Sequence, residues 1–328
     1  MKSTNVTESV QLFQFILYIP TFVLGLVFNT LALWLLLCKI RKWSETTTYM
    51  TNLIIFNSFL LFSLPFKILG YKVARWTFGW SFCVFLESLY FVNMYGSILI
   101  TACITVDRYI AIIHPFLANS IRSPKIALIL CFLIWLVVWG GTSHIYQFHE
   151  GNNHQNCFHG FSEKMWRNAG LIVLLEVSFL STAIIMVFCS AWIIIALGNR
   201  PELGTEGSKM SKSIAIVLAN LVVFLTCFMP YHVGLLLHYL AKNGVLSNIK
   251  LTTNFLRVSL CLANINCCLD GFCYYLVIKE FLNSASMERN TKGRGKNSVF
   301  LEVKMCQESL RHSPKEGKVL IFMNPQTS

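Results

Sequence analysis

The sequence predicts an all-α protein whose core is a bundle of seven transmembrane helices. Of its 328 residues, 55% are hydrophobic and 13% are charged, whereas a soluble domain typically carries about 25% charged residues. The apolar residues fall in blocks, and a helix needs roughly 20 residues to cross the hydrocarbon core of a bilayer. Seven blocks are long enough, at 10–38, 48–70, 82–106, 125–147, 168–197, 213–241 and 253–278.

The first and the last of these blocks have distinctive boundaries. Residues 1–9 are polar, and the apolar run after them is long enough to span, so we expect no cleavable signal peptide. The seventh block is the weakest because Arg257 and Asp270 interrupt it. Most connections are short, including the polar loop at 198–212, so neighbouring spans should pack antiparallel.

The chain is expected to contain one transmembrane domain, at 10–278, with short segments on either side. Residues 1–9 form the N-terminus, and residues 279–288 have the pattern of a short amphipathic helix on the membrane surface. Residues 289–328 are rich in Lys, Ser, Gly and Asn and are predicted to be a disordered tail. No internal repeat is visible, which disfavours many transporter folds.

The orientation follows from the odd number of spans and from the distribution of charge. An odd number puts the two ends of the chain on opposite sides of the membrane. Asn5 starts the only N-glycosylation sequon, and this sequon precedes the first span. Eighteen of the 27 Lys and Arg residues lie on the side that holds the C-terminus. The positive-inside rule therefore predicts a cytoplasmic C-terminus and an extracellular N-terminus in this multi-pass chain.

The outer side is nevertheless rich in basic residues. Lys67, Lys72, Arg75 and Arg257 are among the cations at or near the outer ends of spans. Each of them is equally well explained by a long side chain that reaches for the interface. Together they favour a negatively charged ligand through long-range attraction. The partners expected are such a ligand and membrane lipids, and no nucleic acid.

The twelve cysteines separate by depth. Most lie within the spans, where cysteine behaves as a small buried hydrophobe. Cys83 and Cys157 occupy outer, oxidising positions, and we expect them to form a disulfide that ties the loop after span four to the start of span three. Two free thiols are the alternative. Cys306 in the tail is a weak candidate for palmitoylation.

Polar residues inside the spans carry a further signal. Such groups seek partners within the bundle, because lipid offers none. They are expected to converge on a polar cluster near mid-membrane, or to act only as interhelical hydrogen bonds. The polar residues are Asn29, Asn57, Asn93, Ser97, Asn266 and Asp270.

The chain resembles a rhodopsin-like (class A) G-protein-coupled receptor over residues 10–288. The landmarks of that family occur in its order along the chain. They are Asn29, Asn52-Leu53, Cys83, Asp107-Arg108-Tyr109, Trp135, Cys157, Phe228-Met229-Pro230-Tyr231-His232 and Leu269-Asp270-Gly271-Phe272-Cys273-Tyr274.

Several segments narrow the resemblance to the purinergic and lysophospholipid branch. Phe228 stands where most of the family has tryptophan, and Pro230-Tyr231-His232 follows it. The runs Ser63 to Lys67 and Leu89 to Ser97 are similar to the lysophosphatidylinositol receptor family. The resemblance implies an extracellular anionic ligand, such as a lysophospholipid, and activation of heterotrimeric G proteins, with the G12/13 class suggested by the relatives. A receptor for another anionic metabolite or a nucleotide, and a membrane transporter, remain alternatives.

The resemblance also implies roles for individual residues. Ligand binding falls to Lys67, Glu87, Tyr90, Phe91, His232 and His238, with Glu87 placed to hold Lys67. Coupling and activation fall to Asp107, Arg108, Tyr109, Phe224, Phe228, Pro230 and Tyr274, with Asp107 restraining Arg108 by charge pairing. No cofactor and no enzymatic activity are expected, because no metal-binding or nucleophile motif occurs.

One departure from the family concerns its buried sodium site. The family usually has aspartate in span two, where this chain has Asn57, and asparagine then proline in span seven, where Asp270 and Gly271 stand. The acid and the amide are thus exchanged between two helices. Asp270, Asn93 and Ser97 are candidate sodium ligands, and the exchange shifts the site or removes it. Gly271 is expected to be a flexible point.

Overall fold

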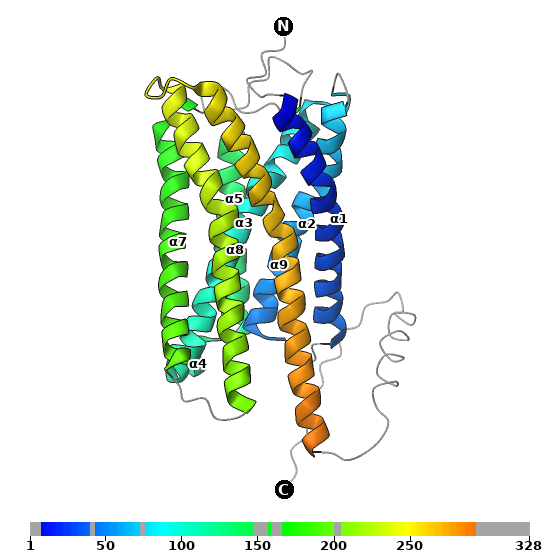
Figure 1. Cartoon of the computed structure of the whole chain (residues 1–328), viewed down its shortest axis with the longest axis vertical. Helices are drawn as coiled ribbons and strands as arrows, with labels where there is room; N and C mark the ends of the chain where they lie inside the picture. The colour runs from blue at the N-terminus through cyan, green and yellow to red at the C-terminus, as the bar shows by residue number, and fades with distance from the viewer. Residues whose placement is uncertain are drawn as a thin grey trace. The chain divides into compact units, whose positions relative to one another are not determined.

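The computed structural model describes residues 8–39, 43–72, 76–146, 157–158, 166–199 and 205–292. Within these ranges the chain is helical and contains no strand. The helices are α1 (Glu8–Lys39), α2 (Glu45–Lys72), α3 (Trp80–Ile113), α4 (Pro115–Ile121), α5 (Pro124–Tyr146), α7 (Ala169–Gly198), α8 (Thr205–Lys242) and α9 (Ile249–Lys292) (Figure 1). The chain divides into two units, 1–280 and 281–328, and the bundle described below is the first.

Seven helices of the described ranges are long and apolar enough to cross a membrane, which confirms the predicted fold class. Some helices extend beyond the predicted spans. α8 begins at Thr205, inside the loop predicted at 198–212, and α3 runs to Ile113 instead of ending at 106. The Asp107-Arg108-Tyr109 motif therefore lies inside the helix. The last residue of α3 is Ile113, and His114 is its C-cap. The helix stops there because Pro115 follows, and the residue before a proline is disfavoured in helical conformation.

Several helices begin at a side chain that caps the first turn. The Asn168 side chain accepts a hydrogen bond from the Leu171 amide at the start of α7. Asn248 does the same for α9, and Ser123 for α5. Polar oxygens at these positions satisfy amide groups that have no partner within the helix.

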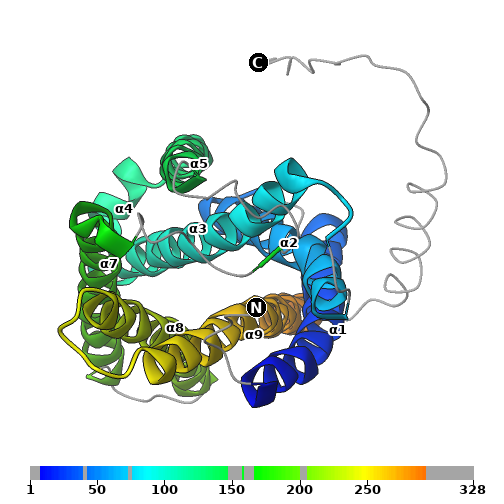
Figure 2. The ribbon, with the colours of Figure 1, turned by 90° about the horizontal axis from the view of Figure 1, so that it is seen from above.

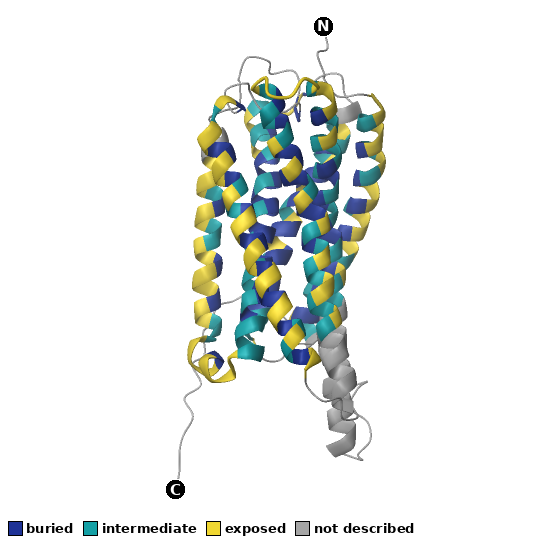
Figure 3. Ribbon diagram, turned by 60° about the vertical axis from the view of Figure 1, so that its left-hand side comes forward, coloured by how far each residue is buried: buried dark blue, intermediate teal, exposed yellow. Residues whose placement is uncertain are grey.

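α3 is the central helix of the bundle. It contacts α2, α5 and α7 along its length and α4 near its end, and it crosses the interior in the view along the bundle (Figure 2). Buried residues form the inward faces of the helices, while exposed apolar residues cover the outward faces (Figure 3). This distribution is the one expected where lipid, not water, surrounds the helices.

Gly271 has a packing role that the sequence did not reveal. α9 passes through it as continuous helix, and a Cβ atom there would lie 3.1 Å from the Asn29 backbone nitrogen in α1. Small residues allow two helix backbones to approach closely in a membrane. The expected flexible point is therefore a contact point between α1 and α9.

The segment at 279–288 is helical, but no separate helix begins there. α9 continues without interruption to Lys292, because neither glycine nor proline occurs between 272 and 292 to break it. Its placement on a membrane surface stays a prediction. Asn5, Cys306 and the tail from 293 lie outside the described residues.

Candidate functional site

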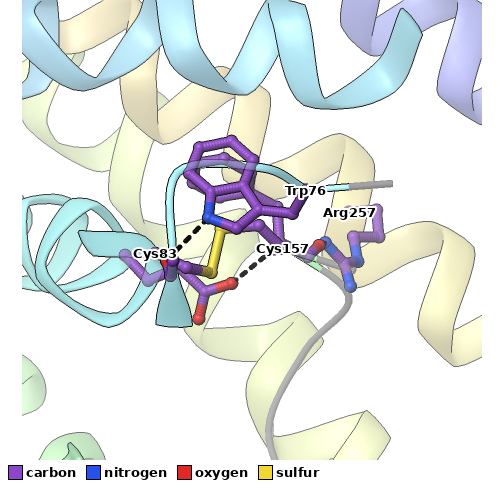
Figure 4. The surroundings of a disulfide bond; sticks show 7 residues. Trp76, Cys83, Cys157 and Arg257 are labelled. Atoms are coloured by element: carbon purple, nitrogen blue, oxygen red, sulfur yellow. Dashed lines mark hydrogen bonds between the residues drawn. A yellow bond between two sulfur atoms is a disulfide. The ribbon is translucent and has the colours of Figure 1, made fainter. Parts of the chain in front are cut away.

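The end of the bundle where α3 begins, called here the disulfide end, is built around a covalent link. Cys83 and Cys157 form a disulfide with an S–S distance of 1.99 Å and a Cα–Cα distance of 5.7 Å, which confirms the predicted pairing. Figure 4 shows Trp76 beside this link and Arg257 on its other side. The link holds residues 157–158 against the top of α3.

Phe158 is fixed by hydrogen bonds on both sides of its backbone. Its amide donates to Glu87 Oε1 at 2.7 Å, and its carbonyl accepts from Arg257 Nη1 at 3.1 Å. Its φ of 65° lies in the left-handed region, which is uncommon for a bulky side chain. The disulfide and these two bonds hold that conformation. The Phe158 ring thereby packs edge-on against Trp76 and Tyr90.

Lys67 lies beneath Phe158 in a cage of aromatic rings. Its side chain is buried, with 3% exposed, and its ammonium lies 4.1 Å from the Tyr90 ring, 4.9 Å from the Tyr18 ring and 5.7 Å from the Phe158 ring. Ring faces attract a cation, by about 2 kcal/mol where water is excluded. Lys67 is thus held in place without a carboxylate as its direct partner among the described residues.

The charges around Lys67 leave an excess of positive charge. Arg257 and Glu87 both act electrostatically on Lys67. Glu87 was predicted to hold Lys67, whereas its described hydrogen bond goes to Phe158. Two cations thus face one carboxylate that already accepts a backbone amide. A buried charge is costly unless it is paired, so this site favours an anion.

A second polar cluster surrounds His232 in α8. The imidazole is 2% exposed and stacks on Phe179 of α7, with ring centroids 3.9 Å apart. Its Nδ1 lies 3.4 Å from Glu176 Oε1, also on α7. Tyr95 of α3 meets the imidazole edge-on at 6.0 Å. His232 was predicted as a ligand contact. The structure shows that Glu176, Tyr95 and Phe179 are its neighbours.

The remaining predicted ligand residues divide between different surroundings. Tyr90 belongs to the Lys67 cage, while the adjacent Phe91 packs with the cores beside α7 and α8. His238 is buried, 4.5 Å from the Trp166 ring, and its Nδ1 is 3.3 Å from Thr252 Oγ1. Its described contacts thus connect α8 to α9 and to the start of α7.

The polar residues of the spans are linked in a buried network. Asn29 Nδ2 donates to the Gly25 and Cys267 carbonyls, and its Oδ1 accepts from Asn57 at 3.2 Å. Asn57 Oδ1 accepts from Asn93 at 3.1 Å and from Ser97 at 3.5 Å. The network therefore joins α1, α2, α3 and α9 at one place.

Asp270 is the carboxylate that stands in span seven instead of span two, and it lies beside this network. Its Oδ2 accepts from Asn266 Nδ2 at 2.6 Å, and Asn57 lies nearby. Neutral amides therefore surround the carboxylate, and Asn57 Oδ1 already accepts from Asn93 and Ser97. A sodium ion at Asp270, Asn93 and Ser97 stays a prediction.

At the opposite end of α3, Asp107 ties three helical segments together. Arg122, which follows α4, donates from Nε to Oδ1 at 2.7 Å and from Nη2 to Oδ2 at 2.9 Å. Thr46 of α2 donates to the same carboxylate at 3.4 Å, and Glu45 lies 3.7 Å from Arg122. Hydrogen bonding to Asp107 raises the pKa of the Arg122 guanidinium above its usual value. Asp107 was predicted to restrain Arg108; its described hydrogen bonds instead fix α4.

The other predicted coupling residues have distinct surroundings. Phe224 and Phe228 of α8 are buried and meet edge-on at 5.4 Å, six and two residues before Pro230. Tyr109 packs against Phe188 of α7, and its hydroxyl is 3.4 Å from His114 Nε2. Arg108 is half-buried, and the side chain of Tyr274 lies outside the described residues.

Sequence reasoning missed several residues of these sites for different reasons. Glu176 is an acid inside the fifth span and carried a usable signal, because intramembrane acids are rare. Phe158 was signalled only by its neighbour Cys157. Tyr18 and Arg122 gave no local signal, since their roles depend on which helices meet.

Comparison with known proteins agrees with this architecture. Residues 28–274 match the family described as 7 transmembrane receptor (rhodopsin family). G-protein coupled receptor 55 of Mus musculus is 40% identical over 294 residues, covering 84% of this chain and 89% of that protein. Lysophosphatidic acid receptor 6 of Mus musculus is 32% identical over 314 residues, covering 92% and 91%.

A third relative shows how wide the similarity is. G-protein coupled receptor 35 of Homo sapiens is 34% identical over 272 residues, covering 81% of this chain and 84% of that protein. The matched region takes in all seven spans in whole or in part. The chain belongs to the rhodopsin family of seven-transmembrane receptors, in its lysophospholipid and purinergic-like branch, and is a multi-pass plasma-membrane receptor, not an enzyme.

Proposed function

We propose that this receptor binds an extracellular anionic lysophospholipid, such as lysophosphatidylinositol, and activates heterotrimeric G proteins. The single observation that carries the proposal is the buried Lys67 in its cage of Tyr18, Tyr90 and Phe158, with Arg257 close by. A phosphate offers the negative charge that would pair with the buried Lys67 and the half-buried Arg257. The relatives named as lysophosphatidic acid receptors support a lipid of this class.

The orientation belongs to the same proposal. The disulfide end faces the outside, where thiols oxidise, and the Asp107 end faces the cytoplasm, where G proteins reside. The charge distribution along the chain supports this orientation. The ligand therefore enters at the end that holds Lys67.

Signalling then occurs by a shift of population between conformations, not by chemistry. The ligand favours a state in which the cytoplasmic end of α8 moves outward. Phe224 and Phe228 repack beside Pro230, where the helix lacks one backbone hydrogen bond. Arg108 and Tyr274 then contact the G protein, for which the G12/13 class is proposed from the resemblance.

A nucleotide or another small anionic metabolite is the second candidate. Related nucleotide receptors commonly carry a cation one turn beyond the His232 position. Here Leu235 stands there and is 2% exposed, in an apolar cluster with Trp166 and Leu175. These surroundings favour a ligand with a hydrocarbon chain over a polar nucleotide. A transporter is excluded by the family.

The test is a screen of acyl-matched anionic lysophospholipids on cells that express the receptor. We expect concentration-dependent nucleotide exchange on a G protein, with cells lacking the receptor as control. A panel that includes the G12/13 class identifies the coupling partner. Activation by nucleotides and by no lysophospholipid would overturn the proposal.

A further inference from the structure

The His232 cluster contains buried polar atoms that nothing in the described part of the chain satisfies. Both ring nitrogens of His232, the Glu176 Oε1 atom and the Tyr95 hydroxyl are shielded from solvent and have no hydrogen-bond partner among the described residues. The 3.4 Å contact between His232 Nδ1 and Glu176 is close without the geometry of a hydrogen bond. Leaving a buried polar group without a partner is energetically unfavourable. Four such atoms in one place therefore indicate a site for a polar guest.

The elements that hold these atoms are firmly packed. His232 is stacked on Phe179 at an interplanar angle of 4°, and Tyr231 meets it edge-on at 5.4 Å. Tyr95 packs with the apolar cluster of Leu171, Ile172 and Leu175, as well as with the core around Phe179. The polar atoms are thus held in fixed positions on α3, α7 and α8, so a guest meets a preformed set of donors and acceptors.

The chemistry of the four atoms defines the guest. A carboxylate only accepts hydrogen bonds, a tyrosine hydroxyl both donates and accepts, and a neutral imidazole offers one donor and one acceptor. A second anionic group is disfavoured by Glu176. An ammonium group only donates, so it would leave the donors of Tyr95 and His232 unsatisfied. Hydroxyl groups both donate and accept, so they can pair with the donors and with the acceptors of this cluster.

This cluster lies close to the cationic site along α3. Tyr90 contacts Lys67 and Tyr95 contacts His232, and five residues of helix separate the two tyrosines by about 7.5 Å along the axis. One ligand head can therefore engage both regions, with its phosphate at Lys67 and Arg257. We propose that Glu176, His232 and Tyr95 form a second subsite that binds hydroxyl groups of the ligand head. The inference rests on the proposed function and adds the chemistry that selects among anionic lysophospholipids.

The test compares two acyl-matched phosphodiesters by competition binding. Lysophosphatidylinositol carries ring hydroxyls, whereas lysophosphatidylmethanol has the same phosphodiester charge and no hydroxyl on its head group. In the wild type we expect lysophosphatidylinositol to bind more tightly by about tenfold or more, the size expected for a hydrogen bond to a charged group. Glu176→Leu should reduce this preference to less than about threefold by weakening lysophosphatidylinositol alone.

Two further variants separate binding from packing. His232→Phe keeps a ring on Phe179 and removes both nitrogens, so it should also reduce the preference. Glu176→Gln retains an acceptor oxygen and should keep part of the preference for lysophosphatidylinositol. If Glu176 only supports packing, Glu176→Leu should weaken the binding of both lipids equally. The thermal stability of each purified variant measures any packing effect separately.

Different results would overturn the proposed subsite and the proposed function. An unchanged preference in Glu176→Leu and His232→Phe, or equal weakening of both lipids, overturns the subsite and leaves water as the occupant. Wild-type receptor that binds neither lipid overturns the proposed function, and the subsite as a lipid site with it.

Discussion

Replacement of Lys67 is the most direct test of the anionic ligand, because the structure separates the charge of this residue from its packing. The side chain is buried, and its ammonium lies within 5.7 Å of the centroids of three rings. Lys67→Met keeps the buried volume and removes the charge. Lys67→Arg keeps the charge in a bulkier group.

The expected loss follows from the interaction of a phosphate with a buried cation. A hydrogen bond to a charged group contributes about 1.5–3 kcal/mol, which corresponds to a loss of affinity of roughly 10- to 150-fold at 1.4 kcal/mol per tenfold. Arg257 stays in the site and still attracts the phosphate, so the lower part of this range is expected for Lys67→Met. Lys67→Arg should weaken binding less, because guanidinium also pairs with phosphate and stacks on rings.

Lys67→Met should weaken ligand binding without lowering the thermal stability of the ligand-free receptor. Without ligand, burial and the like charge of Arg257 both disfavour the Lys67 cation. Lys67→Met removes both costs, which offset the lost attraction to the rings, and should leave thermal stability equal or higher. The assay is competition binding at matched surface expression, together with a thermal melt of the ligand-free receptor. Equal affinity of wild type and Lys67→Met for an active lysophospholipid would refute the assignment of Lys67 to the site.

Three further predictions concern the rest of the bundle. Asn57→Asp places a second carboxylate beside Asp270, so sodium should inhibit agonist binding more strongly; an unchanged response between 0 and about 0.15 M sodium, the physiological range of ionic strength, would reject a sodium role. Arg108→Ala should reduce G-protein activation severalfold with ligand affinity retained, and full signalling by the well-expressed variant would count against its role. Arg122→Gln should lower coupling by releasing α4 from Asp107, with only partial rescue by Arg122→Lys because lysine cannot bond both oxygens in parallel; activation equal to wild type would show that α4 need not be held.

The fold was predictable because its signal is local. Each span is a block of apolar residues whose length alone identifies it, and the disulfide followed from two cysteines at outer positions. The end of α3 was misjudged because a charged motif was taken to mark the end of the helix. In the structure Asp107 is buried inside α3, and its charge is met by Arg122.

The candidate sites were only partly predictable, since their members come from distant parts of the chain. Lys67 and His232 carried recognisable signals, as a cation near a span end and as part of a family motif. Which groups face them depends on helix packing, which periodicity does not determine in a segment that is apolar on every face. For this reason the sequence proposed Glu87 as a partner of Lys67 but did not reveal that Glu87 accepts the backbone amide of Phe158.

The aromatic contacts suggest how occupation of the His232 cluster reaches the centre of the bundle. Phe224, Phe228 and His232 are four residues apart along α8 and therefore share one face of that helix. Phe179 of α7 stacks on both His232 and Phe224, at 3.9 Å and 5.9 Å, and Phe224 meets Phe228. A ligand group that moves the imidazole must therefore change the packing of Phe179, and with it the contact between α7 and α8 beside Pro230. Such contiguity is a route for coupling, and two discrete arrangements of these rings are what would make it a switch. His232→Phe preserves the stack on Phe179 and removes the hydrogen bonds of the imidazole. If this variant binds the hydroxyl-bearing lipid more weakly but retains full efficacy, the ring nitrogens recognise the ligand and the stacked rings form the switch.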